Sequence, residues 1–330
     1  MPTIDDVAVK AQVSTATVSR ALNGKSSVDP ELAERVRRAA AELGYQPNGP
    51  ARNLRRKTTA TLSLIVPDVT HPFYASISRG FEDTARAAGY SVVLCNTDDD
   101  PDKERRYLEV ARQECFAGVV MCPAPTATQI DDLTGPTTPV VTLDGACETH
   151  DRVLVDSRAA VERAAVHLIS QGYQRLACVI EPACHTDTGR LAGFHRAHRA
   201  AGRADDGQVV VCRADGGPSD PYVMLTALLS DPAPPDALLV ARHELAEGAL
   251  RAIAERGLRL GADIGVVVFD DAPWLSLLRP AVSVVSRPAY AIGTTAARQV
   301  LARLTAKSNG VEDTALQADL IVRGSSIRVP

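Results

Sequence analysis

Three short helical patterns follow one another at the N-terminus, and they restrict this part of the chain to a small all-helical unit. Thr3, Ser14 and Asp29 are suitable N-cap residues before the three patterns, and Gly44 is a stop signal after the last. Within each pattern apolar residues recur three or four positions apart and share one face. These inward positions are Ile4, Val7, Ala8 and Ala11, then Val18 and Leu22, and finally Leu32, Val36, Ala39, Ala40 and Leu43. Three helices around one miniature core are therefore predicted for residues 1–47.

The outward face of the second pattern carries side chains that suit the major groove of DNA. Thr15, Ala16 and Arg20 lie at its start and one turn later, where a recognition helix presents side chains to base edges. Arginine can donate two hydrogen bonds to guanine, and an alanine methyl can contact thymine. Short polar side chains nearby suit phosphate oxygens, namely Ser14, Thr17, Ser19 and Asn23. The sequence thus predicts a helix-turn-helix that reads double-stranded DNA.

Charge is divided unevenly along the chain. Residues 1–57 hold ten Lys and Arg against six Asp and Glu, a net charge of +4, whereas the whole chain has −4, so residues 58–330 carry −8. A basic end of this kind meets phosphate, and the acidic remainder is kept away from it. DNA binding is expected to weaken steeply with salt, because each neutralised phosphate releases counterions.

From Thr61 onward, apolar runs of strand length alternate with helical stretches. The expected strands are 62–66, 91–95, 118–121, 140–143, 176–180, 208–212, 237–240 and 265–269, and the expected helices are 75–88, 103–114, 159–171, 190–201, 222–229 and 245–255. Continuous apolar runs are typical of parallel strands that helices cover on both faces. The pattern predicts an α/β body of doubly wound parallel sheets, with ligands at the carboxyl ends of the strands.

The composition favours a soluble, cytoplasmic protein. No run of about 18 apolar residues is present to span a membrane. Asp5 and Asp6 lie where a signal peptide needs a basic segment and an apolar core. The seven cysteines are odd in number and lack C-x-x-C spacing, so they indicate neither a disulfide framework nor a zinc ribbon.

Short motifs along the chain resemble those of the LacI/GalR family, the lac-repressor-like transcription regulators. In chain order they are Thr3 to Ala8, Val13 to Asn23, Tyr45 to Asn48, Ala51 to Leu54, Pro72 to Tyr74, Gly189 to Phe194, Phe269 to Asp271 and Ile321 to Ser325. The resemblance extends over the whole chain. It implies a DNA-binding headpiece and a two-lobed body like that of periplasmic solute-binding proteins, in which a small effector binds between the lobes.

The resemblance also implies domain boundaries. Residues 1–47 form the DNA-binding domain, 48–57 a hinge helix and 58–330 the body, with lobe 1 at about 60–157 and 288–319 and lobe 2 at about 158–287 and 320–330. The hinge orders when two copies pair over the minor groove, insert Leu54 between base steps and kink the duplex, with Arg55 near phosphate. Gly49 and Pro50 weaken the start of this helix, so disorder without DNA is expected. From the residues alone, a solvated basic tether is an equal alternative.

The expected effector site lies in the cleft between the lobes. Its candidate residues are His71, Phe73, Tyr74, Cys122, Asp144, Arg190, Arg242, His243 and Asp270. Asp270 can accept hydrogen bonds from two hydroxyls of a polyol, and Arg190 can bind a carboxylate, a phosphate or a ring oxygen. Each candidate also has a structural alternative. An aspartate at a strand end, such as Asp270, can serve as a cap, and Arg190 can form an ion pair between the lobes.

Some positions depart from the family pattern. Gln12 stands in a turn where glycine is common, at a cost of about 1–2 kcal/mol if its backbone is left-handed. Arg242 and His243 stand where Asn-Asp is common, and His71 where Asn is usual. Together with Arg190, these side chains predict a cationic cleft and an effector that carries a carboxylate or phosphate.

No catalytic residue, metal site or cofactor is expected. Asp98, Asp99 and Asp100 fit a loop before a helix at Pro101 better than a metal site. No G-x-G-x-x-G occurs, and the histidines lack H-x-x-x-H or nucleophile–base spacing. The alternative to a ligand-responsive regulator is a solute-binding or sugar-processing protein with a vestigial headpiece.

The expected assembly is a homodimer formed by the body, with two headpieces on the half-sites of a pseudo-palindromic operator. No leucine heptad follows Arg323 to Ser326, so a coiled-coil route to a tetramer is not indicated. A repressor is favoured, whose operator affinity changes when the effector shifts lobe closure. The sequence does not give the sign of that change.

Overall fold

The computed structural model divides the chain into two compact units, residues 1–59 and 60–330. It describes residues 2–22, 28–45, 59–124, 130–135, 137–143, 149–181, 185–203, 207–213, 217–305 and 310–329. Among these residues, no helix has the length and apolar character needed to cross a membrane.

The N-terminal unit consists of three helices, α1 (Ile4–Lys10), α2 (Thr15–Leu22) and α3 (Pro30–Leu43). A capping box opens α1, since the Thr3 hydroxyl accepts from the Asp6 amide while the Asp6 carboxylate accepts from the Thr3 amide. One residue from each helix, Val7, Val18 and Val36, is completely buried in the shared core. The start of α3 differs in detail from the prediction, because Ala33 rather than Leu32 is buried.

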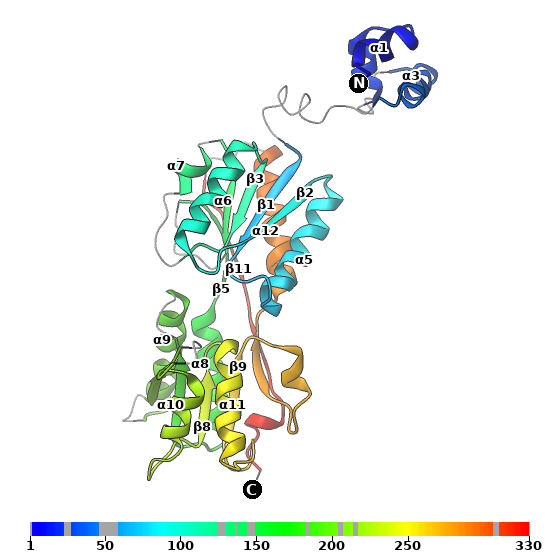
Figure 1. The fold of residues 1–330 in the computed structure, drawn as a ribbon. Helices are drawn as coiled ribbons and strands as arrows, with labels where there is room; N and C mark the ends of the chain where they lie inside the picture. The colour runs from blue at the N-terminus through cyan, green and yellow to red at the C-terminus, as the bar shows by residue number, and fades with distance from the viewer. Residues whose placement is uncertain are drawn as a thin grey trace. The chain divides into compact units, whose positions relative to one another are not determined.

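The first lobe of the body is built on a six-stranded sheet in the order β11-β5-β4-β3-β1-β2. Its strands are β1 (Thr61–Val66), β2 (Ser91–Asn96), β3 (Gly118–Met121), β4 (Val140–Leu143), β5 (Asp151–Val155) and β11 (Asp313–Leu316). Helices α5 (Pro72–Ala87) and α12 (Ala289–Thr305) pack together on one face, and α6 (Pro101–Gln113) and α7 (Ile130–Thr134) lie on the other (Figure 1). Burial on both faces explains the continuous apolar runs of β1 and β3.

The second lobe repeats this architecture with the strand order β12-β10-β9-β8-β6-β7. Its strands are β6 (Leu176–Ile180), β7 (Gln208–Val211), β8 (Ala237–Val240), β9 (Gly265–Phe269), β10 (Ser283–Ser286) and β12 (Asp319–Ile321), and its helices are α8 (Ser157–Ser170), α9 (His185–Ala200), α10 (Pro221–Leu228) and α11 (Ala246–Glu255). The pair α8 and α9 packs together, as does the pair α10 and α11 (Figure 1). Short 3-10 turns η1 (His243–Leu245), η2 (Pro273–Ser276) and η3 (Gly324–Ser326) complete the lobe.

One edge strand departs from the predicted parallel sheets. Strand β12 pairs antiparallel with β10, whereas the other strand pairs of the described residues are parallel. The connectivity supplies the reason. After β10 the chain leaves lobe 2 and forms α12 in lobe 1. It returns to lobe 2 along β12, so β10 and β12 run in opposite directions.

Two helices begin earlier than their hydrophobic pattern indicated. Helices α5 and α6 start at Pro72 and Pro101, where proline is tolerated because the first helical amide has no intrahelical acceptor. Their N-caps are His71, whose Nδ1 accepts from the Phe73 amide at 3.0 Å, and Asp100, whose carboxylate accepts from the Asp102 amide at 2.8 Å. The Asp100 contact confirms the predicted helix-start loop.

Candidate functional site

The predicted base-reading residues lie together on the exposed side of α2. Val18 and Ala21 turn inward and are 0% and 4% exposed. Because helical residues repeat every 3.6 positions, this anchoring turns Thr15, Ala16 and Arg20 outward, and all three are exposed. The structure therefore presents these three side chains on one accessible surface.

The predicted phosphate donors differ in how they are held. The Ser14 hydroxyl accepts from the Thr17 amide at 3.2 Å and lies 2.9 Å from the Thr17 hydroxyl, so both side chains stiffen the first turn of α2. Ser14 is exposed, and Thr17 and Ser19 are half-buried. Three other residues with predicted DNA roles, Asn23, Leu54 and Arg55, lie outside the described residues, as does the proposed hinge.

Gln12 has a left-handed backbone, with φ of 52°, in the turn between α1 and α2. We expect Gln12→Gly to stabilise the N-terminal unit by about 0.5–1 kcal/mol, because relief of left-handed strain exceeds the entropy that glycine adds to the unfolded chain. Amide hydrogen exchange of the full chain measures this as slower exchange in α1 to α3. Gln12→Ala is the matched control, since alanine keeps the Cβ and should give no gain. Equal exchange in the glycine variant and the parent would refute the strain argument.

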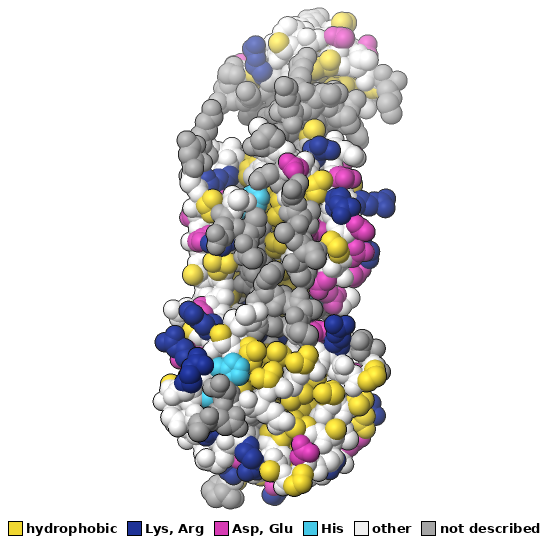
Figure 2. All heavy atoms as spheres, turned by 90° about the vertical axis from the view of Figure 1, so that its left-hand side faces the viewer, with side chains coloured by type: hydrophobic (Ala, Val, Ile, Leu, Met, Phe, Trp, Pro, Cys, Tyr) yellow, Lys and Arg dark blue, Asp and Glu magenta, His cyan; other side chains and the backbone are white. Residues whose placement is uncertain are grey.

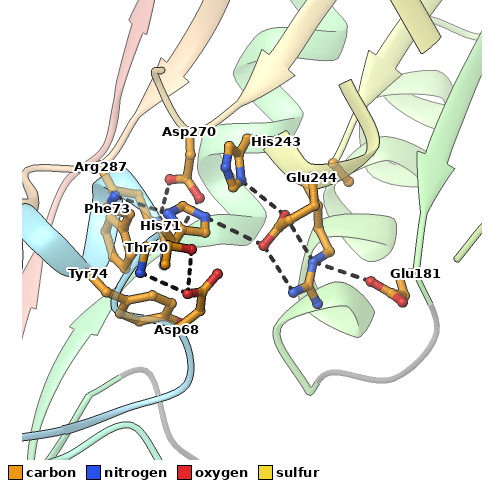
Figure 3. Close-up of polar contacts among 12 residues, drawn as sticks. Asp68, Thr70, His71, Phe73, Tyr74, Glu181, His243, Glu244, Asp270 and Arg287 are labelled. Carbon is orange, nitrogen blue, oxygen red and sulfur yellow. Dashed lines mark hydrogen bonds and ion pairs between the residues drawn. The ribbon is translucent and has the colours of Figure 1, made fainter. Parts of the chain in front are cut away.

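The second candidate site is the interlobe junction, which we define as the residues that follow the carboxyl ends of β1, β3, β6, β8, β9 and β10. Lobe 1 contributes His71, Phe73 and Tyr74 after β1, and Cys122 after β3. Lobe 2 contributes Glu181, Arg242, His243, Glu244, Asp270 and Arg287. Figure 3 shows His71 and Phe73 of lobe 1 beside His243, Glu244, Asp270 and Arg287 of lobe 2.

A buried ion pair lies at the centre of the junction. Arg287 donates from Nε and Nη2 to the two carboxylate oxygens of Asp270, each at 2.7 Å, and the side chains are only 7% and 8% exposed. Burial alone raises the pKa of the Asp270 carboxyl, but the charge and hydrogen bonds of Arg287 hold it below its ordinary value. Asp270 also has a positive φ of 70°, an uncommon backbone for a residue other than glycine.

Aromatic rings flank the arginines of the junction. The guanidinium of Arg287 lies 3.4 Å from the centroid of Phe73, which belongs to lobe 1, and that of Arg190 lies 3.9 Å from the centroid of Phe269. Arg190 also donates from Nη1 to the carbonyl of Ala241 at 2.6 Å. The arrangement combines flat apolar surface with fixed polar groups, as small-molecule sites do.

Glu244 connects the lobes on the other side of the junction. Its carboxylate lies 3.5 Å from Nε2 of His71, 3.1 Å from Nδ1 of His243 and 3.4 Å from Arg242. Burial alone raises the pKa of Glu244, yet the two histidines and Arg242 hold it well below its usual range. Arg242 has a second carboxylate, that of Glu181, at 3.7 Å.

The structure brings most of the predicted effector residues to one place. His71, Phe73, Tyr74, Cys122, Arg190, Arg242, His243 and Asp270 all lie at the junction, with Tyr74 Oη 3.8 Å from Cys122 Sγ. Asp144 lies outside the described residues. Arg190 contacts Ala241 and Phe269, both of lobe 2, and its charge helps to lower the pKa of Asp270.

The prediction of a cationic cleft is wrong. Arg287 pairs with Asp270, and Arg242 pairs with Glu244 and Glu181, so carboxylates balance these cations. Sequence reasoning missed Glu244, Glu181, Phe269 and Arg287 as site residues. Two signals were present, because Glu244 directly follows His243 and Arg287 follows a strand that ends at the crossing between lobes.

Two family models match the chain. Residues 3–48 match the bacterial regulatory proteins of the lacI family, and residues 59–323 match the periplasmic binding proteins and sugar binding domain of the LacI family. The chain belongs to the LacI family. Helix α2 and the interlobe junction are therefore parts of a LacI-family regulator rather than of an isolated binding protein.

Similar proteins span the full length of this LacI-family chain. It is 33% identical over 329 residues to the ribose operon repressor of Halalkalibacterium halodurans, with 98% of this chain and 96% of that protein covered. It is 30% identical over 335 residues to the transcriptional repressor CytR of Escherichia coli, covering 99% and 97%. The lac repressor dimer bound to operator shares the fold, with a TM-score of 0.85, 24% identity and 99% of both chains covered.

Proposed function

We propose that this protein is a transcriptional repressor that binds operator DNA through α2. Its affinity for the operator changes when a sugar occupies the interlobe junction. The observation that carries the proposal is the outward set Thr15, Ala16 and Arg20 on an anchored helix, in one chain with a LacI-family sugar-binding body. A vestigial headpiece would not need this surface. Nothing favours the alternative of a solute-binding or sugar-processing protein, and we assign the chain no catalytic role.

We propose a neutral sugar, with ribose as the first candidate, as the effector. Two observations support this proposal, one from similar proteins and one from the ion pairs of the junction. Similar proteins of 33% and 32% identity are named ribose operon repressors. Within the junction, Asp270 pairs with Arg287 and Glu244 pairs with Arg242, so a carboxylate or phosphate ligand would have to compete with carboxylates that already bind these arginines. This replaces the anionic effector predicted from the sequence.

We further propose that the active form is a homodimer in the cytoplasm. The lac repressor, which shares the fold, is described as a dimer bound to operator. On the face drawn in Figure 2, hydrophobic side chains gather over a broad area of the second lobe, a feature typical of protein contact surfaces. Residues 48–57 would form the hinge between two such bodies and the DNA.

The experiment begins by selecting binding sites for the full chain from random double-stranded DNA. The expected product is a pseudo-palindrome, bound with an affinity that falls steeply as salt rises. Recovery of no common sequence, or an affinity independent of salt, would reject the repressor. Ribose is then added at a fixed salt concentration, and a change in operator affinity is the expected result.

The effector class is decided separately by thermal unfolding. Ribose should raise the melting temperature more than ribose 5-phosphate at equal concentration. A larger rise with the phosphate would restore the anionic effector, and no rise with either would reject ribose while leaving DNA recognition intact.

A further inference from the structure

We propose that the interlobe junction contains a binding site for a divalent transition-metal ion, formed by His71 of lobe 1 with His243 and Glu244 of lobe 2. One ligand atom from each residue can be chosen so that all three lie within 4.8 Å of one another. Two imidazoles and one carboxylate form a recognised zinc ligand set, which leaves a fourth position for water or another ligand. Figure 3 shows the three side chains converging from the two lobes.

Two contacts of the Glu244 carboxylate with the histidines have lengths close to the donor separations around a bound zinc ion. Zinc lies about 2.0–2.2 Å from nitrogen and oxygen ligands, so donor atoms in a tetrahedral site stand about 3.3 Å apart. Oε1 of Glu244 lies 3.5 Å from Nε2 of His71, and Oε2 of Glu244 lies 3.1 Å from Nδ1 of His243. The two rings approach to 3.7 Å between centroids. The chosen donor atoms of all three residues lie within 4.8 Å of one another, so the side chains would have to move together to reach tetrahedral spacing.

The second observation concerns the histidine nitrogen itself. Nδ1 of His243 is buried and makes no hydrogen bond to the described residues, although a Glu244 oxygen is close to it. A buried nitrogen of this kind can give its lone pair to a cation. A bound ion would satisfy it and would hold the two lobes together.

Two features of the structure work against tight binding. Nδ1 of His71 accepts the capping hydrogen bond from the Phe73 amide, so the ring proton sits on Nε2. When a metal takes Nε2, this proton moves to Nδ1 and the cap is lost. The positive charge of Arg242, 3.4 Å from Glu244, would repel a metal cation bound to that carboxylate. Arg242 can also pair with Glu181, which lies 3.7 Å away. Removal of the Arg242 charge should therefore strengthen metal binding.

The test is a calorimetric titration of the full chain with zinc chloride, in a Cys115→Ser background that removes an exposed thiol. One saturable site per chain is expected, with a melting temperature about 3 °C higher at excess zinc. Magnesium, which prefers oxygen ligands, should give neither effect. Cobalt in place of zinc should give a visible absorption band that reports its coordination.

Matched variants separate the proposed site from adventitious surface binding. His71→Asn keeps a side chain that can cap α5 but removes Nε2, and it should abolish the zinc effect, as should His243→Asn. His195→Asn, on α9, should leave it unchanged. Arg242→Gln should increase zinc affinity severalfold. Zinc binding that survives in His71→Asn, or the absence of any saturable site in the parent, would overturn the proposal.

Discussion

We expect Asp270→Asn to lower the free energy of unfolding of the body by about 3–5 kcal/mol, because it leaves the Arg287 guanidinium buried without a carboxylate. The pair is held by two hydrogen bonds of 2.7 Å and both side chains are less than a tenth exposed. Asparagine has nearly the same shape and tolerates a left-handed backbone, so the φ of 70° at this position should not add to the loss. Urea denaturation followed by circular dichroism measures the change.

The chain provides a matched control for this effect. Asp263 binds Arg259 in the same two-pronged way, at 2.9 and 3.0 Å, but the arginine side chain is 75% exposed. Asp263→Asn should therefore cost less than about 1 kcal/mol. The double variant Asp270→Asn with Arg287→Gln should recover much of the loss, since the Arg287 charge is then removed together with its partner. Equal losses for Asp270→Asn and Asp263→Asn would show that burial does not set the strength of the central pair.

The second large effect is expected on DNA recognition. Arg20→Ala should weaken binding to the selected operator by roughly 10- to 100-fold, the range for loss of one bidentate contact to guanine. Binding to unrelated DNA should fall much less, because that binding depends on total positive charge. Fluorescence anisotropy with operator and scrambled duplexes measures both affinities, and their ratio should fall.

Arg37→Ala is the control for the loss of one positive charge. Arg37 lies on α3, has a side chain that is 56% exposed, and pairs with Glu34 in the same helix. It should change both affinities by a similar small factor. If Arg20→Ala instead lowered both affinities equally, Arg20 would be a phosphate contact and not a base reader.

The sequence predicted the fold well where the deciding pattern is local. Capping residues, helical spacing and continuous apolar runs each depend on neighbours within a few positions. The three helices of the N-terminal unit and eight strands of the body were therefore anticipated. The early start of α5 at Pro72 was missed, because its hydrophobic pattern begins one turn after the cap. The direction of β12 was missed because it depends on the route between lobes.

The site was predicted less completely than the fold. The sequence indicates which residues lie at the junction, but it does not indicate which side chains pair with one another. His71, Arg242 and Asp270 were recognised as junction residues. A cationic cleft is expected only when the positive side chains are considered without the carboxylates that pair with them. Glu181 and Arg287 are 61 and 17 positions away from their partners along the chain, and sequence spacing carries no distance between them.

The sequence by itself determined that this protein begins with a small helical unit whose second helix has Thr15, Ala16 and Arg20 outward, followed by an α/β body. Periodicity is sufficient for that, since which side of a helix faces the core follows from the repeat. Only the tertiary structure decided the chemistry between the lobes. The chain crosses three times between the lobes, and the resulting fold places Glu244 of lobe 2 beside His71 of lobe 1. The energy of a charge depends on what lies within a few ångströms of it, and folding alone sets that neighbourhood.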